Sequence, residues 1–188
     1  MEYINSLLSD VVEINICYKN LSILPDLSRF TCLQKLDCSF NQLIKLNNLP
    51  DSLLQLNCMS NKLTRLDNLP IYLQKLNCSD NSLTQLNNLP QFLQELNCSY
   101  NKLTQLDNLP SFLEILNCSY NRLTQINLPS SLLLLNCSDN FLTQLNNLPQ
   151  FLQELSCLYN KLTQLDNLPY YLEELNCSFN QITRSTPL

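Results

Sequence analysis

The 188-residue sequence contains no glycine, no histidine and no tryptophan. Glycine normally supplies the tight turns of a globular domain, so this chain must turn by another device, and asparagine and proline at fixed positions are the candidates. Without histidine, the usual general base and metal ligand is missing, and without glycine no glycine-rich phosphate loop can form. The sequence therefore predicts no enzyme, no cofactor and no metal site.

Positive charge is also scarce, with 11 lysines and arginines against 16 acidic residues and a formal net charge of −5. This balance argues against a general affinity for nucleic acid or for an anionic membrane. Leucines are regularly interrupted by polar residues, so we expect no membrane span. The first ten residues lack a basic start and a continuous apolar stretch. We therefore expect no secretory signal and an intracellular, cytoplasmic location.

What the sequence has in abundance is leucine and asparagine, arranged in a repeat of about twenty residues. The pattern is L-x-x-L-x-C-x-x-N-x-L-x-x-L-x-N-L-P-x-x. A degenerate unit opens near Val11, and the unit over residues 113–131 is one residue short. The full-pattern units begin at Leu33, Leu53, Leu73, Leu93, Leu113, Leu132, Leu152 and Leu172.

Each unit opens with a short strand in which Leu36 and Cys38, or their equivalents, point to one face. One unit cannot bury its leucines alone, but stacked units can, and their strands then form a continuous parallel sheet. Pro50 and its equivalents predict extended segments on the convex side, which is too short for a full helix. An aromatic residue precedes many units and is expected to stack as a spine that closes the core: Tyr72, Phe92, Phe112, Phe151 and Tyr171.

An asparagine follows the strand in all eight full-pattern units and is expected to satisfy backbone groups where the chain turns a corner. We interpret these residues as a structural ladder and not as ligand-binding residues. Its members are Asn41, Asn61, Asn81, Asn101, Asn121, Asn140, Asn160 and Asn180.

Eight of the ten cysteines occupy one inward position of the strand. Free cysteine behaves as a small hydrophobe, and strand spacing suits a disulfide poorly, so we expect these thiols to be reduced and buried. Cys17 and Cys32 lie outside this series, and the sequence leaves a bond between them open. The cysteine ladder comprises Cys38, Cys58, Cys78, Cys98, Cys118, Cys137, Cys157 and Cys177.

The pattern N-L-P-x-x-L-x-x-L-x-C-S-x-N-x-L-T-x-L resembles the short leucine-rich repeats of secreted bacterial effectors and giant-virus proteins. The resemblance covers roughly residues 11–184. It implies a right-handed leucine-rich-repeat coil with a concave parallel sheet, and a protein-interaction scaffold of viral or bacterial origin. The bacterial effectors sometimes carry a ubiquitin-ligase domain, which we do not expect here. The cysteine also departs from the leucine, valine or isoleucine that the family commonly has at that position.

A partner-binding surface is sought where residues depart from the repeat. Ile115 and Leu134 replace charged residues or glutamine on adjacent strands, in a concave face that changes from basic to acidic along its length. Exposed apolar and tyrosine side chains are typical anchors of protein interfaces. The alternative is neutral drift of a duplicated repeat. The predicted protein-binding residues are Tyr100, Ile115, Tyr120, Leu134, Leu158 and Tyr159.

The predicted organisation is a cap over residues 1–10, a solenoid of about nine repeats over residues 11–184, and a tail over residues 185–188. The favoured function is binding of a protein partner through the concave face. A structural protein that forms homo-oligomers is the alternative, because the terminal strand near residues 176–179 offers an edge for self-association.

Overall fold

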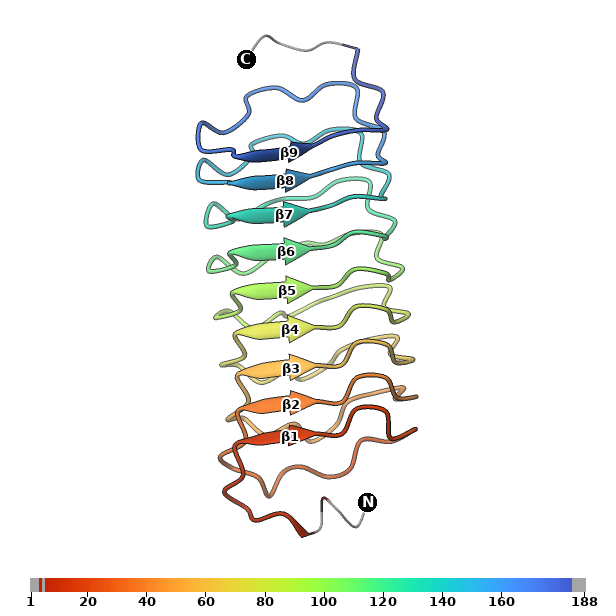
Figure 1. The fold of residues 1–188 in the computed structure, drawn as a ribbon, viewed down its shortest axis with the longest axis vertical. Helices are drawn as coiled ribbons and strands as arrows, with labels where there is room; N and C mark the ends of the chain where they lie inside the picture. The colour runs from red at the N-terminus through yellow and green to blue at the C-terminus, as the bar shows by residue number, and fades with distance from the viewer. Residues whose placement is uncertain (1–3, 5, 184–188) are drawn as a thin grey trace.

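The computed structural model describes residue 4 and residues 6–183. The fold is a solenoid whose nine parallel strands stack in chain order (Figure 1). This confirms the predicted β-rich solenoid with one continuous parallel sheet. The strands are β1 (Glu13–Asn15), β2 (Lys35–Asp37), β3 (Gln55–Asn57), β4 (Lys75–Asn77), β5 (Glu95–Asn97), β6 (Ile115–Asn117), β7 (Leu134–Asn136), β8 (Glu154–Ser156) and β9 (Glu174–Asn176).

Neighbouring strands pair residue for residue, so equivalent positions of the repeat lie side by side. Leu36 is opposite Leu56, and Leu116 is opposite Leu135 even though the unit between β6 and β7 is one residue short. The missing residue belongs to the convex side, where Asn127 alone occupies the place of two residues in the other full units. The sheet therefore keeps its register through the deletion.

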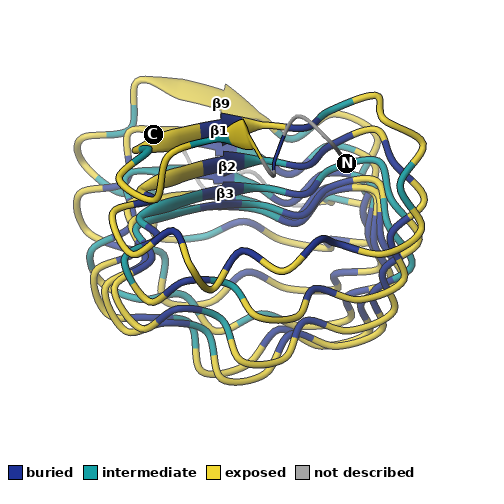
Figure 2. Cartoon of the chain, turned by 90° about the horizontal axis from the view of Figure 1, so that it is seen from below, coloured by how far each residue is buried: buried dark blue, intermediate teal, exposed yellow. Residues whose placement is uncertain are grey.

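Leucines and one cysteine per coil fill the interior, and the buried residues line the inside of the tube (Figure 2). In β2 to β8 the middle residue is buried, while its neighbours are exposed or half-buried. This alternation follows from the two-residue period of a strand. Phe30 is fully buried in the first coil, where the repeat is degenerate. The core is thus one continuous column along the solenoid axis.

Left-handed backbone at two positions of the repeat replaces the missing glycines. The first is an asparagine on the convex side, such as Asn48 with φ of 53°. Asparagine tolerates this conformation better than most residues, as the sequence predicts. The second position follows each strand, and its left-handed backbone was not predicted. Its φ values lie between 51° and 55°, and from β2 onward it holds Phe40, Ser60, Asp80, Tyr100, Tyr120, Asp139, Tyr159 and Phe179.

The predicted aromatic spine stacks but does not close the core. The rings of Tyr72 and Phe92 lie 5.9 Å apart, and those of Phe92 and Phe112 lie 6.1 Å apart. All the spine residues are nevertheless exposed. The turn there is closed by a backbone hydrogen bond, in which the amide of Leu53 donates to the carbonyl of Pro50 at 3.1 Å, and the leucine takes the inward place. The expectation of a core-closing spine was therefore wrong.

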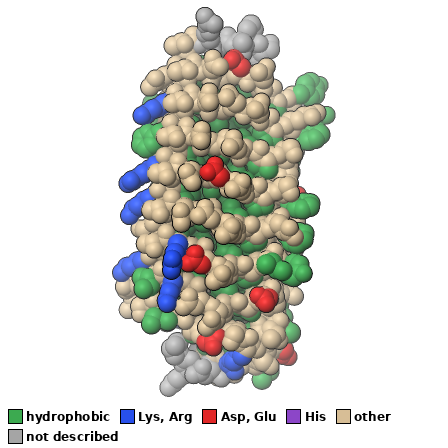
Figure 3. All heavy atoms as spheres, turned by 180° about the vertical axis from the view of Figure 1, so that it is seen from behind, with side chains coloured by type: hydrophobic (Ala, Val, Ile, Leu, Met, Phe, Trp, Pro, Cys, Tyr) green, Lys and Arg blue, Asp and Glu red, His purple; other side chains and the backbone are tan. Residues whose placement is uncertain are grey.

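The convex side consists of extended segments and short turns, as predicted. From Leu7 to Thr183 the described residues contain no helix. Seen from behind, hydrophobic side chains gather along one edge of the body, and lysines and arginines along the opposite edge (Figure 3). No described helix has the length and apolar character that a membrane crossing requires.

Described residues of the segment that the sequence predicts as an N-terminal cap pack on the first coil. Ile4 is buried and Leu7 packs against the core, while Leu8 is exposed. The guanidinium of Arg29 donates hydrogen bonds to the carbonyl of Ile4 at 2.6 Å and to that of Leu7 at 3.3 Å. At the other end, all three residues of β9 are exposed. The predicted tail over residues 185–188 lies outside the described residues.

Candidate functional site

The asparagine that follows each strand from β2 onward joins two neighbouring coils. The side-chain amide of Asn101 donates to the carbonyls of Cys78 at 3.0 Å, Cys98 at 3.1 Å and Ser99 at 3.1 Å. Its oxygen accepts the backbone N–H of Leu83 at 2.9 Å. The amide nitrogen and the oxygen of this buried side chain are therefore both engaged with the backbone. The geometry leaves Asn101 no group with which to hold a ligand.

The cysteine position forms a column of thiols inside the tube. Burial raises the pKa of Cys78 to about 12 and that of Cys98 well above the ordinary value of 9.0. The thiolate is the reactive form, so these cysteines are unsuited to act as nucleophiles. Cys32 is exposed, Cys17 is half-buried, and neither forms a disulfide. The fully buried members are Cys38, Cys58, Cys78, Cys98, Cys118, Cys137 and Cys157.

Alkylation of the native chain should separate the cysteines into two classes. We expect Cys32 to react quickly with iodoacetamide, and the seven buried thiols to react at least about a thousandfold more slowly, because each requires opening of the fold. Peptide mass spectrometry after timed quenching measures this, and the same reaction in urea, where all ten thiols should react, is the control. Rapid native labelling of Cys98 would show that the column is open to solvent.

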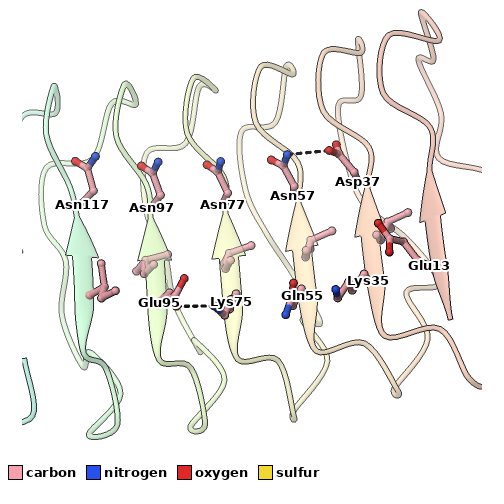
Figure 4. Close-up of a pocket in the computed structure, with 15 residues that line it drawn as sticks. Glu13, Lys35, Asp37, Gln55, Asn57, Lys75, Asn77, Glu95, Asn97 and Asn117 are labelled. Carbon is pink, nitrogen blue, oxygen red and sulfur yellow. Dashed lines mark hydrogen bonds and ion pairs between the residues drawn. The ribbon is translucent and has the colours of Figure 1, made fainter. Parts of the chain in front are cut away.

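The N-terminal half of the concave face is polar (Figure 4). The ammonium of Lys75 pairs with the carboxylate of Glu95 at 2.6 Å, and the side-chain amide of Asn57 donates to Asp37 at 3.1 Å. Glu13 on β1 also precedes Lys35 in the same column. The expected change from basic to acidic is therefore present only in part, because the ion pair and Glu13 neutralise much of the basic half.

The apolar pair lies farther along the same sheet. Ile115 of β6 is directly opposite Leu134 of β7, and both line a hollow of about 370 Å³. Ile115 is 36% exposed and Leu134 is half-buried. The hollow continues past Glu154 and Glu174, both exposed. The structure thus joins an apolar pair to an acidic end of the concave face, and we call this surface the concave patch.

The predicted tyrosines lie in a different hollow. Tyr100, Tyr120 and Tyr159 occupy the left-handed position after the strands and line a hollow of about 620 Å³ with Asp139 and Phe141. Leu158, half-buried, is the residue immediately before this position. The structure therefore divides five of the six predicted residues between the concave patch and a second surface, which we call the flank column, and Leu158 lines neither hollow. The flank column is the series of left-handed residues named above, from Phe40 to Phe179, which are aromatic or acidic except for Ser60.

Chemical groups for catalysis are sparse in the described part of the chain. It holds no cluster of three or more histidine, cysteine or acidic residues arranged to bind a metal ion. The surface hollows are open grooves lined mainly by amides, ring faces and leucines. Such surfaces are suited to contact another molecule over an area.

The parallel solenoid, the asparagine ladder and the repeat length together define a leucine-rich-repeat protein of the short-repeat type, and the chain belongs to that class. No protein-family model matches the sequence, and a comparison with curated proteins finds no match. Solved structures of bacterial proteins do match over most of the chain.

YopM from Yersinia enterocolitica WA-314 is 34% identical, with a TM-score of 0.91, and the match covers 95% of this chain and 40% of that one. The functional domain of InlJ from Listeria monocytogenes, which includes a cysteine ladder, is 31% identical, with a TM-score of 0.83 and coverage of 95% and 42%. The LRR domain of a Shigella effector is 31% identical, with a TM-score of 0.65 and coverage of 87% and 63%. This chain therefore spans less than two thirds of each of these three chains.

Proposed function

We propose that this chain is an interaction scaffold that binds a protein partner through the concave patch. The observation that supports this most strongly is the pairing of Ile115 with Leu134, two apolar side chains side by side on the otherwise polar face of an open sheet. Partly exposed apolar side chains in a hollow, rimmed by polar groups, are typical of the centre of a protein interface.

The surroundings indicate which chemistry the partner carries. Glu154 and Glu174 follow the apolar pair, and neither forms a salt bridge within the described residues. A partner segment with an apolar side chain next to lysine or arginine would complement both features. We propose that it lies across the strands, along the solenoid axis, with its apolar side chain on Ile115 and Leu134.

The test is affinity capture from a eukaryotic cell extract with wild type and the Ile115→Asp/Leu134→Lys double variant. We expect the wild type to retain a protein that the double variant loses, with at least about a tenfold drop in affinity because hot-spot truncations cost 2 kcal/mol or more. Ile71→Asp/Phe112→Lys changes two exposed residues at the loop that precedes the strands and is the matched control. Equal retention of the partner by wild type and the double variant would remove the concave patch from the proposal.

Self-association is the second candidate. In the described chain, β9 has a strand neighbour on one side only, and Leu175 at its centre is 41% exposed. An open strand edge with an apolar residue is a template for pairing with another copy. Light scattering across a dilution series tests this: a mass that stays at 21.8 kDa contradicts it. A mass that doubles at high concentration and returns to the monomer in Leu175→Lys supports it.

We also propose that the protein acts inside a cell, in the cytoplasm. Support comes from the similarity to bacterial effectors and from the column of buried, unbonded cysteines, which suits a reducing compartment. Fractionation of producing and recipient cells with an antibody against the chain tests this.

A further inference from the structure

The flank column forms two aromatic stacks separated by one acidic residue. Tyr100 stacks on Tyr120 with ring centroids 4.1 Å apart, and Tyr159 stacks on Phe179 with centroids 4.3 Å apart. The ring planes within each pair are nearly parallel, at 9° and 8°. Asp139 occupies the coil between the two pairs. A ladder of five side chains thus has four rings and one carboxylate.

Backbone hydrogen bonds place these residues on consecutive coils. The amide of Tyr120 donates to Ser138 at 3.0 Å, directly before Asp139, and the amide of Asp139 donates to Leu158 at 2.9 Å, directly before Tyr159. The backbones of Tyr120 and Tyr159 are therefore two strand spacings apart, about 9.5 Å. One face of each tyrosine is covered by its stacking partner, so the open faces of both border the place of Asp139.

Asp139 supplies the negative charge of the space between Tyr120 and Tyr159, which we call the gap. The hydrogen bond with Tyr100 raises the pKa of the Tyr120 phenol most, and the negative charge of Asp139 raises it next. A weaker hydrogen bond with Asp139 also contributes, so the carboxylate lies near the Tyr120 ring. No lysine or arginine among the described residues forms a salt bridge with Asp139. Arg122, the nearest cation along the chain, is not in a salt bridge with it either. Lys161 lies over the Phe141 ring at 4.8 Å, and Lys102 donates to Ser82 at 3.2 Å. The gap therefore combines exposed ring faces with a carboxylate that carries no cation.

We propose that the gap between Tyr120 and Tyr159 binds the guanidinium group of an arginine from a protein partner, with Asp139 as the carboxylate that receives its hydrogen bonds. A guanidinium is flat, stacks on aromatic faces and forms paired hydrogen bonds with a carboxylate. The spacing of about two strands between Tyr120 and Tyr159 admits one guanidinium group between the two rings, stacked on the open face of either tyrosine. Lysine, with a compact and strongly hydrated ammonium, matches the charge but not the shape.

The inference rests on the proposed function only in that a protein partner provides the arginine. The site is separate from the concave patch, because the two hollows share no lining residue. A small arginine probe therefore tests the gap without knowledge of the partner. If the arginine probe does not bind at the gap, the proposed role of the concave patch is not contradicted. The Ile115→Asp/Leu134→Lys variant should bind the probe as wild type does.

The experiment is an NMR titration of the isotope-labelled full chain with N-acetylarginine amide. We expect saturable shifts of the Tyr120 and Tyr159 ring signals and of the Asp139 amide, and at least about tenfold weaker binding of N-acetyllysine amide, since lysine lacks the stacking surface. Saturable binding confined to these residues supports the proposal. No shift at these residues at the highest soluble probe concentration, or equal binding of lysine, overturns it.

Two substitutions in the same column make the test specific. Asp139→Tyr fills the gap with a ring and should abolish binding, whereas Asp80→Tyr makes the same change in a coil outside the gap and should leave binding intact. Both positions already have the backbone that Tyr120 adopts, with φ of 51° to 53°. Should Asp139→Tyr fail to fold, Asp139→Asn keeps a residue that accepts this backbone and should weaken binding at least about tenfold. Unchanged binding in the gap variants overturns the proposal.

Discussion

Raising the pH above 9 should unfold this protein in a single steep transition with a midpoint at about pH 10. Seven core thiols have a pKa raised by burial above the ordinary value of 9.0, with Cys38, Cys78 and Cys157 raised to about 12. In the unfolded chain these thiols ionise from pH 9 upward, whereas in the folded chain they stay protonated. The unfolded state therefore loses protons first, and stability falls as pH rises.

The size of the effect follows from linkage. Each thiol that ionises only in the unfolded chain costs about 1.4 kcal/mol of stability per pH unit. Seven of them approach roughly 10 kcal/mol per pH unit, which is comparable with the whole stability of a typical domain. Below pH 8 these groups contribute no pH dependence, because both states are protonated.

Urea unfolding followed by circular dichroism between pH 7 and 10 measures the slope. The Cys78→Ala/Cys98→Ala variant removes two of the seven thiols and should reduce the slope by about two sevenths, whatever its stability at neutral pH. Cys32→Ala changes an exposed thiol and is the control that should leave the slope as it is. A stability independent of pH between 8.5 and 10 in wild type would contradict the burial of the column.

Asn101→Ala should lower the free energy of unfolding by about 4 kcal/mol. The substitution leaves the N–H of Leu83 without a partner inside the coil. Three carbonyls each lose one hydrogen bond but keep another: that of Cys78 still accepts from Asn81, that of Cys98 from Asn121 and that of Ser99 from the amide of Asp80. A buried group left unsatisfied costs about 1–3 kcal/mol, and water reaches only part of this site. Since each repeat contacts only its neighbours, we also expect the two halves of the solenoid to unfold less cooperatively.

Asn97→Ala is the matched control, four residues earlier on the open face of the sheet. The oxygen of Asn97 accepts from the amide of Ser99 at 3.1 Å and from its hydroxyl at 2.7 Å, beside solvent. Its loss should cost no more than about 1 kcal/mol, because water replaces the contacts. Urea denaturation of both variants at pH 7 gives the comparison. Equal effects would mean that the ladder asparagine does not stabilise the junction between coils.

Much of the fold is predictable from the repeat because one pattern specifies every coil. The spacing of Leu36, Cys38 and Asn41 indicates a two-residue strand period followed by a turn, and the structure repeats it coil after coil. The short unit keeps its strand register because its deletion falls on the convex side, away from the sheet. Strand position and core composition therefore follow from the sequence.

The side-chain surfaces are less predictable because they depend on which way the backbone turns after the strand. Tyr100 and Ile115 both depart from the polar repeat, yet the left-handed backbone at Tyr100 carries its ring into the flank column and away from the concave patch. A signal for this was present: the same position also holds Asp80 and Asp139, and aspartate is favoured in left-handed backbone. The exposure of the Tyr72 to Tyr171 spine had no comparable signal.

The central claim, that a partner lies on the concave patch, is tested most directly by site-specific photo-crosslinking in a eukaryotic cell extract. A benzophenone amino acid is placed at position 115 in one sample and at the exposed position 71 in another, each with unlabelled wild type as competitor. We predict one cross-linked protein from position 115, lost with competitor and absent from position 71. Equal cross-linking from both positions, or none from position 115, would contradict the account.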